Sequence, residues 1–485
     1  MRFRQFQSVL LVLALLNNSS VVYANVSPSQ TLVEQRKIQS PAKKVREQQQ
    51  QRQPAPAVEA GSSRSEHSNT AAPSQVLFEK TKRRAQVRST HRKEIPSAPS
   101  VEKYLIEGRL ADGEAAMLAQ LKEQPVDDQV RFGLGMLQFL RAVEGLMQDF
   151  HRYGMRGLST AGFGPFRRLP VPDNPTPETM SYENARGIAK KLIERLSSAE
   201  ITLSSISDTN VKLPVHFGMI RFDFNNDGHA SEEESLWKVY SSFSSDSRVS
   251  AAKAEDFYIC FDRGDVHWLR GYCHLIMAFC QMYLAYDTKE TFECTAHLLF
   301  KKVDTPYSYL NKGKHIKTIG SDGVELLDLI AFIHLIRWSV VEPARMEEAL
   351  HDLEAVVAQS DVTWNFYMSE TDDDREWIPN PKQKGVIPNV QVTDAMICSW
   401  RELMHQIDQV LAGKLLVPFW RGDDDRGVNV RRVFLEPSAL DLVLWVQGPA
   451  AAPYLESGEK TKIDTWQGIR RDFGRQFPGF ALWFN

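Results

Sequence analysis

Apolar residues recur at helical spacing through most of residues 99–485. In residues 324–335 apolar side chains surround almost the whole helix, which predicts a helix at the centre of the core. The sequence therefore predicts a mainly α protein. We expect helices over 101–150 with a break at Pro125, and over 182–206, 264–286, 291–300, 323–341, 343–358 and 392–412.

The pattern changes in residues 415–485. Short apolar runs at 415–420 and 443–446 lie between Gly- and Asp-rich turns, which predicts one or two short strands in a short mixed α/β segment. A helix is expected over 464–473. The aromatic end, residues 480–485, is expected to pack into the core.

The first two helices carry a pattern that resembles a known repeat. Pro125 and the pair Leu134-Gly135 have the spacing found between two tetratricopeptide repeats, where a Pro closes one repeat and Leu-Gly lies in the next helix. The resemblance implies a hairpin of that type around residues 101–150. Because residues 151–180 are rich in Gly and Pro, no array of period ~34 follows, and an ordinary helical hairpin is the alternative.

Residues 1–24 have the composition of a secretory signal peptide. Basic Arg2 and Arg4 precede a short apolar run, and small residues at Val22 and Ala24 predict cleavage after Ala24. The apolar run is too short for a membrane span, which takes about 20 residues. We therefore expect an exported protein, secreted or periplasmic, with no transmembrane segment.

Residues 25–98 are expected to form a disordered linker. They are rich in Gln, Pro and Ser, contain almost no aromatic residues, and carry a net charge of +8, whereas residues 99–485 carry −13. The basic linker could bind an envelope or cell-surface partner, or it could be a solvated tether. We expect no nucleic-acid partner, because the densest basic cluster, residues 82–84, has only three charges.

The body is long enough for two or more hydrophobic cores. Its five cysteines contain no Cys-x-x-Cys pair, which argues against a zinc ribbon or a thioredoxin-like site. Cys273 and Cys280 lie too far apart on one helix to bridge each other. Either Cys260 or Cys294 pairs with one of them, or all five are buried thiols. We divide the body into a helical region at 99–210, a calcium loop with its exit helix at 211–250, a helical core at 251–414 and the mixed segment at 415–485.

The most specific motif in the chain lies at residues 223–234. Oxygen-bearing side chains occur at positions 1, 3, 5, 9 and 12 of this segment, and Gly228 occurs at position 6. The segment is similar to the calcium-binding loop of an EF-hand, whose ligands have that spacing. The resemblance implies one Ca²⁺ site formed by the side chains of Asp223, Asn225, Asp227, Ser231 and Glu234 and by the backbone carbonyl of His229.

Two features of this segment depart from the EF-hand pattern. Position 8 is Ala230, where a larger apolar residue usually joins a partner hand, and the chain has no second loop of this pattern. Residues 216–222 read as extended chain as easily as helix, so a strand–loop–helix site is an alternative to a full hand. A loop without metal is also possible, because Ser231 and Glu234 by themselves make a capping-box pattern.

Other acidic and histidine residues occur near the start of the 264–286 helix. His267 and His274 lie roughly 10.5 Å apart along a helix axis, so one metal ion cannot bind both. Asp262 and Asp265 are expected to cap the helix instead.

The sequence leaves two functions open. The first is an exported calcium-binding protein that acts as a binding or scaffold module, with Ca²⁺ as a structural ion. The alternative is a secreted hydrolase with acidic catalytic residues in the C-terminal half, because a carboxylate pair leaves no spacing pattern in a sequence. The acidic runs 372–374 and 423–425 are interpreted as solvated turns. Four tryptophans could line a sugar groove, although core positions are the simpler expectation: Trp364, Trp377, Trp420 and Trp445.

Overall fold

The computed structural model describes residues 99–156, 171–244, 250–312, 326–386, 392–421, 425–474, 477 and 480–481. The predicted signal peptide and basic linker lie outside these residues, as does most of the acidic run 423–425. Within the described residues the chain is mostly helical with small sheets, which confirms the predicted mainly α class.

The first helices follow the predicted ranges with one additional break. Pro125 separates α4 from α5 as expected, and a second break at Gly108, whose φ is +67°, separates α3 from α4. Asp127 caps α5 by accepting a hydrogen bond from the backbone N–H of Val130. The helices are α3 (Glu102–Glu107), α4 (Leu110–Glu123), α5 (Asp128–Arg152) and α6 (Tyr182–Ser204).

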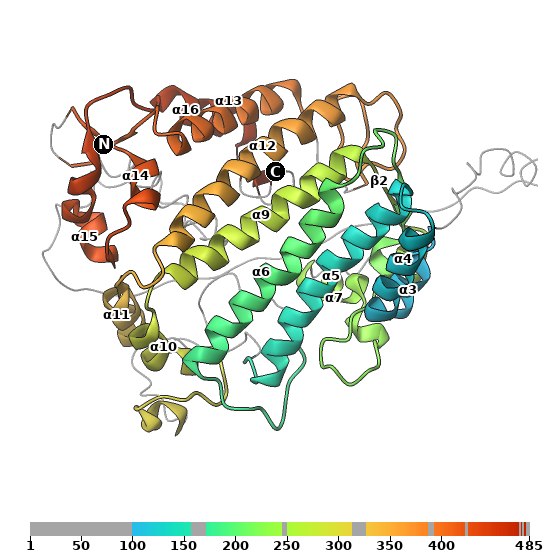
Figure 1. Ribbon diagram of the computed structural model, residues 1–485, viewed down its shortest axis with the longest axis horizontal. Coiled ribbons are helices and arrows are strands. Elements are labelled where there is room, and N and C mark those ends of the chain that lie inside the picture. Colours follow the sequence, from blue (N-terminus) through green and yellow to red (C-terminus); the bar gives the residue numbers. More distant parts are fainter. Residues whose placement is uncertain are drawn as a thin grey trace, which may run out of the picture. The chain divides into compact units, whose positions relative to one another are not determined.

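Four long helices lie side by side in the order α5, α6, α9, α12 (Figure 1). The last two are α9 (Arg263–Ala285), close to the predicted 264–286, and α12 (Ala344–Ser369), which is longer than the predicted 343–358. The α9–α12 contact is the most extensive between any two elements. It brings the start of α9 next to the end of α12, where Asp265 meets Tyr367.

The apolar segment around residues 326–335 is not the central core helix that its composition predicted. It forms α11 (Leu326–Leu335), which packs against α10 (Lys289–Thr295) and α15 (Leu442–Gln447) and leaves Ile330 and Ile333 44% and 38% exposed. A helix that is apolar on all sides can be buried at the centre of a protein. Here α12, not α11, packs along α9 in the main hydrophobic cluster. The predicted helix 291–300 is divided between α10 and a 3₁₀ turn, η6 (Ala296–Leu298).

The C-terminal part is mixed α/β, as predicted. It follows α13 (Asp394–Leu411), which ends before Gly413 at φ +73°, and it includes α16 (Ile463–Phe473). Phe480 is buried and stacks on Trp364 of α12, so the described part of the aromatic end packs into the core as expected. Its other elements are β4 (Val417–Pro418), β5 (Gly427–Val428), α14 (Val430–Leu435), β6 (Leu440–Asp441), α15, η8 (Pro449–Tyr454) and β7 (Leu455–Glu456).

The sheets are short and antiparallel. Strand β1 (Leu213–Val215) pairs with β2 (Ile259–Phe261), and β3 (Arg337–Trp338) pairs with β6. The third sheet has the order β4-β5-β7. The β1–β2 pair holds the chain that leads into the 223–234 segment against the chain that leads into α9.

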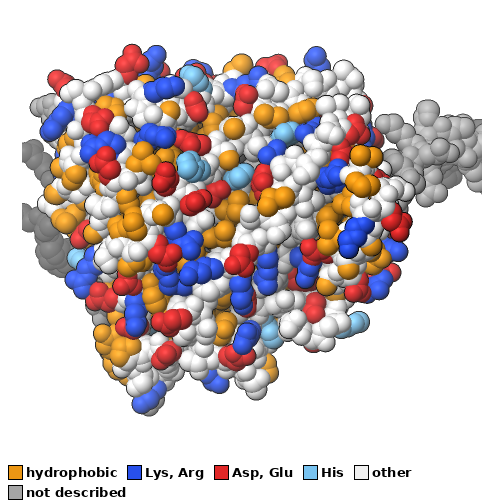
Figure 2. Space-filling model, in the orientation of Figure 1, with side chains coloured by type: hydrophobic (Ala, Val, Ile, Leu, Met, Phe, Trp, Pro, Cys, Tyr) orange, Lys and Arg blue, Asp and Glu red, His pale blue; other side chains and the backbone are white. Residues whose placement is uncertain are grey.

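The main hydrophobic cluster contains residues from Val101 to Ala481, and three smaller clusters adjoin its helices and the C-terminal sheet. The described residues thus have one large hydrophobic cluster with smaller ones beside it. Figure 2 shows acidic and basic side chains interspersed over one face, so the negative charge of the body is not gathered into a single patch there. None of the described helices combines the length and the apolar composition needed to span a bilayer.

All five cysteines lie among the described residues and carry free thiols. The alternative of a disulfide involving Cys260 or Cys294 is therefore not seen among these residues. The alternative of five buried thiols holds for Cys260 and Cys273, which are buried, but not for Cys398, which is exposed on α13.

Candidate functional site

The 223–234 segment forms a closed loop between two short flanks. The chain enters through β1 and a 3₁₀ turn, η4 (Phe217–Met219), and leaves through η5 (Glu232–Glu234) into α7 (Leu236–Ser244). Arg221 and Ser235 form an antiparallel bridge, and the N–H of Leu236 donates to the carbonyl of Ile220 at 2.9 Å. The entry is therefore extended chain with a short turn, in agreement with the strand–loop–helix alternative.

The first half of the loop is wound around the carboxylate of Asp223. Its Oδ1 accepts from the N–H of Asp227 at 3.1 Å, and its Oδ2 accepts from the N–H of Gly228 at 2.9 Å. Asn226 and Gly228 have φ values of +57° and +83°, which allow the chain to turn this tightly. Positions 1 to 6 thus form a compact turn, in which Asn225 Oδ1 accepts from the N–H of Asp227 at 2.9 Å and the Asp227 carboxylate accepts from the N–H of His229 at 2.8 Å and from the Asn225 amide at 2.8 Å.

Glu234 at position 12 lies inside the loop and is bound to protein donors. Its Oε1 accepts from the N–H of Phe224 at 2.9 Å, and its Oε2 accepts from the N–H of Ser231 at 3.0 Å and from the Ser231 hydroxyl at 2.7 Å. The capping box predicted for Ser231 and Glu234 is therefore present. In the described part of the chain, Asp223, Asp227 and Glu234 do not form a group of three carboxylates spaced for one ion.

Two side chains of helix α5 hold the backbone of the loop at Asp223. Glu144 accepts from the N–H of Asp223 at 3.0 Å, and the side-chain amide of Gln148, one turn later, donates to the carbonyl of Asp223 at 2.8 Å. Burial, and then the nearby charges of Asp223 and Glu234, raise the pKa of Glu144 to about 7, although the hydrogen bond from Asp223 works in the opposite direction. Phe222 and Phe224 on either side are buried and stack at 4.9 Å.

The end of α3 covers position 8 of the loop. The N–H of Arg221 donates to the carbonyl of Leu105 at 3.0 Å, and Gly108 packs so closely against Ala230 that a methyl group at position 108 would overlap its side chain. This contact occupies the place where an EF-hand meets a partner hand, and it explains why position 8 is small here. The spacing of residues within the loop did not predict that α3 and α5 would contact it.

A second candidate site is a cluster of carboxyl groups where α9 begins and α12 ends. Oxygen atoms of Asp262, Glu370 and Glu376 lie within 4.8 Å of one another. Asp262 caps α9 and forms a reciprocal capping box with Asp265, as the sequence predicted. Asp265 in turn accepts from the hydroxyl of Tyr367 at 2.7 Å.

Protein donors already occupy several oxygen atoms of this cluster. Asp262 accepts from the N–H of Gly264 at 2.7 Å, and Glu376 accepts from the N–H of Asp374 at 2.9 Å. One oxygen of Glu370 accepts from Gln383 at 3.1 Å, while its buried Oε1 has no hydrogen-bond donor among the described residues. Since an ion would have to displace these donors, we assign no metal to the cluster.

Burial and mutual repulsion favour the protonated form of these carboxyl groups. Burial is the largest effect on each, and it raises the pKa of Asp262 and that of Asp265. Burial together with the neighbouring Asp262 raises the pKa of Glu370 to about 10, and burial raises the pKa of Glu376 to about 7. At neutral pH the cluster therefore retains at least one proton.

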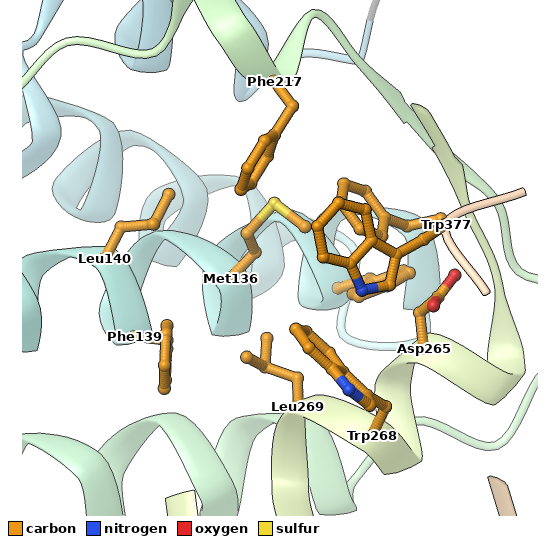
Figure 3. Close-up of a pocket in the computed structure, with 10 residues that line it drawn as sticks. Met136, Phe139, Leu140, Phe217, Asp265, Trp268, Leu269 and Trp377 are labelled. Carbon is orange, nitrogen blue, oxygen red and sulfur yellow. The ribbon is translucent and has the colours of Figure 1, made fainter. Parts of the chain in front are cut away.

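An apolar cavity of about 70 Å³ lies beside the cluster (Figure 3). Asp265 is at its edge and is its single carboxyl group, and Trp377 closes one side against Trp268 of α9, with ring centroids 5.9 Å apart. The remaining lining residues come from α5, α9, η4 and β2: Phe132, Met136, Phe139, Leu140, Phe217, Phe261 and Leu269.

The two α9 histidines have separate partners, as their spacing predicted. A ring nitrogen of His267 lies 2.7 Å from Oε1 of Gln359, and burial lowers the pKa of His267 to about 4. His274 lies between Asp352 of α12, at 2.8 Å, and Glu200 of α6, at 3.6 Å. Burial alone would lower the pKa of His274, but these two carboxylates outweigh it and raise the pKa to about 9. These contacts join α6, α9 and α12.

The other predicted residues lie as follows. Trp364 and Trp377 are buried and Trp420 and Trp445 are partly buried against the smaller C-terminal cluster, so the core expectation is the better one. Asp372 and Asp374 are not purely solvated, because both pair with Lys212. Comparison with protein-family models, with curated proteins and with solved structures finds no match to this chain.

Proposed function

We propose that this chain is an exported calcium-binding protein whose 223–234 loop holds one structural Ca²⁺ ion. The observation that carries the proposal is the coincidence of an oxygen-donor spacing of 1, 3, 5, 9 and 12 with a positive φ at Gly228 in position 6. A capped turn explains positions 9 and 12, but it does not require oxygen donors at Asp223, Asn225 and Asp227.

The donor set fits a hard cation, because it consists of carboxylate, amide, hydroxyl and carbonyl oxygens. Binding requires changes in the described geometry. Glu234 must exchange its bonds to Phe224 and Ser231 for the ion. The side-chain oxygens of Asn225 and Asp227, which accept from one another and from N–H groups of the loop, must face the ion as well. Asp223 can stay in place because α5 holds its backbone on both sides. A lone loop outside the cytosol is expected to bind with a Kd of about 10⁻⁴–10⁻³ M, which suits a structural ion in calcium-rich surroundings.

We further propose that the helical body acts as a binding or scaffold module. The support is its row of long helices and the hairpin of α4 and α5, which we propose is of the tetratricopeptide type because Leu134-Gly135 lies where α5 approaches Leu203 of α6. The basic segment 25–98 is proposed to hold the protein at an anionic envelope or cell surface.

The hydrolase alternative gains no support from the cavity beside Asp265. A volume of about 70 Å³ has room for roughly two water molecules. Its lining offers one carboxyl group, whereas the alternative needs two carboxylates on either side of a substrate bond.

Calorimetric titration of the full-length chain with Ca²⁺ up to about ten times the expected Kd tests the calcium proposal. We expect saturable binding of one ion per chain, lost in Glu234→Gln. Glu232→Gln is the matched control, because it removes the same charge from an exposed residue of the same turn that is not a predicted ligand. Absence of heat in the unaltered protein, or equal binding by Glu234→Gln, would reduce the loop to a capped turn.

A further inference from the structure

We propose that the carboxyl cluster is a proton-dependent latch, which holds segment 370–386 closed over the aromatic cavity and releases it as pH rises. The parts of the latch come from three elements. Asp262 and Asp265 lie at the start of α9, Glu370 follows α12, and Glu376 lies within the segment itself.

The segment makes many hydrogen bonds within itself, although its middle part, residues 376–380, is buried. Glu376 pairs with Gly385 in a bridge, and the N–H of Val386 donates to the carbonyl of Glu376 at 2.9 Å. The side-chain amide of Gln383 donates to the carbonyl of Asp372 at 2.9 Å. A segment of this kind can move away from the body without losing its internal hydrogen bonds.

Direct bonds join the segment to the body at several points. Arg375 donates to the carbonyls of Tyr258 at 2.8 Å and Asp256 at 3.3 Å, and its own carbonyl accepts from the N–H of Cys260 at 3.4 Å. Asn380 donates to the carbonyl of Tyr367 at 2.9 Å. Lys212 pairs with Asp372 and Asp374. The apolar attachments are Trp377, whose ring packs against Trp268, Phe217 and Phe261 at the cavity, and Ile378, which is buried in the main hydrophobic cluster.

The ionisation state of the carboxyl groups changes the free energy of closing the segment. Three carboxylates with oxygen atoms within 4.8 Å repel one another when all are ionised, and a shared proton removes that repulsion. The buried Oε1 of Glu370 has no donor among the described residues, and a proton between Glu370 and Asp262 would satisfy it. Closing the segment therefore requires a proton, which opening releases.

The surroundings do not supply enough positive charge to replace this proton. Lys212 is the cation next to the cluster, and its ammonium is shared between Asp372 and Asp374. The titratable groups that face the cluster are Cys260 from β2, Asp262 and Asp265 from α9, Tyr367 and Glu370 from the end of α12, Asp372, Asp374 and Glu376 from the segment, and Lys212 from the chain before β1.

The sign of the pH effect follows from where the proton binds. The carboxyl of Glu370 binds its proton more tightly in the closed segment than in an open, solvated one. The closed form is therefore fully stabilised below pH about 4.5 and loses stability as pH rises toward about 10. For one proton, the equilibrium constant for opening rises about tenfold for each pH unit inside this window.

Hydrogen exchange of the full-length chain, followed by mass spectrometry at pH 6 and pH 9, tests the latch. After correction for intrinsic exchange, we expect opening of peptides from 371–386 to increase by a factor of up to about 1,000 between the two pH values, while the middle of α5 is unchanged. Glu370→Gln reduces the pH dependence most, because Glu376 still titrates in this range, and Asp262→Asn, which can still cap α9, also reduces it. Glu348→Gln, at an exposed position of α12, keeps it.

Three results would overturn the proposal. The first is equal protection of 371–386 at both pH values in the unaltered protein, and the second is an undiminished pH dependence in both Glu370→Gln and Asp262→Asn. The third is restoration of protection at pH 9 by millimolar Ca²⁺ or Mn²⁺ with reversal by EDTA, since the cluster would then be a cation site.

Discussion

Gly108 at the end of α3 packs directly against Ala230 at position 8 of the 223–234 loop. The contact leaves no space for a side chain at Gly108 or for a larger one at Ala230. A substitution that makes position 8 more similar to a paired EF-hand should therefore harm this protein.

We expect Ala230→Val to lower the free energy of unfolding by about 1–3 kcal/mol, because the added methyl groups would overlap the backbone at Gly108. Urea denaturation measures the effect. His229→Val, at the exposed preceding position, introduces the same branched side chain without this contact and should change stability by less than about 0.5 kcal/mol. Equal losses in the two variants would argue against the packing explanation.

Calcium should stabilise the fold as a simple ligand. With a Kd of about 10⁻⁴–10⁻³ M, 10 mM Ca²⁺ adds about 1.4–2.7 kcal/mol to the free energy of unfolding. Thermal unfolding in Ca²⁺ and in EDTA should differ by a few degrees, and Glu234→Gln should show no difference. An equal shift with Mg²⁺ would indicate nonspecific screening, because Mg²⁺ demands a smaller octahedral site.

Asp128 should contribute more to stability than the neighbouring cap. Its buried Oδ2 accepts from the N–H groups of Ser207 and Asp208, each at 2.7 Å, and so ties α5 to the end of α6. We expect Asp128→Ala to cost about 2–4 kcal/mol, since two backbone donors lose their partner. Asp127→Ala removes an N-cap and should cost about 1 kcal/mol. Similar losses on denaturation would contradict this ranking.

The ion pairs of His274 should give the protein a measurable pH dependence. Because its folded pKa of about 9 lies above the unfolded value, its contribution is fully present below pH 6.5 and is lost as pH rises through 9. Relative to His274→Gln, the unaltered protein should lose about 1–3 kcal/mol across this range. His405→Gln, at an exposed site, should follow the unaltered protein. Parallel pH curves for the unaltered protein and His274→Gln would exclude His274 as the cause.

The sequence predicted those helices and caps that depend only on residues close to one another in the chain. Helical periodicity located α6, α9 and α13, and the spacing of Asp262 and Asp265 predicted the cap of α9. The carboxyl cluster was missed, because Glu370 and Glu376 meet Asp262 only through the pairing of α9 with α12, more than 100 residues apart. Likewise, Ala230 in the sequence was only a departure from a pattern, and its contact with Gly108 depends on a partner far away in the chain.

The hydrogen bond from the N–H of Arg221 to the carbonyl of Leu105 can form only late in synthesis of the chain. When α3 leaves the ribosome, the chain that completes its packing has not been made, and more than 110 further residues must be added. At a synthesis rate of about 5–20 residues per second, this delay is roughly 6–23 s. During that interval the buried side of α3, including Leu105, has no partner from the loop region and depends on its contacts with α4.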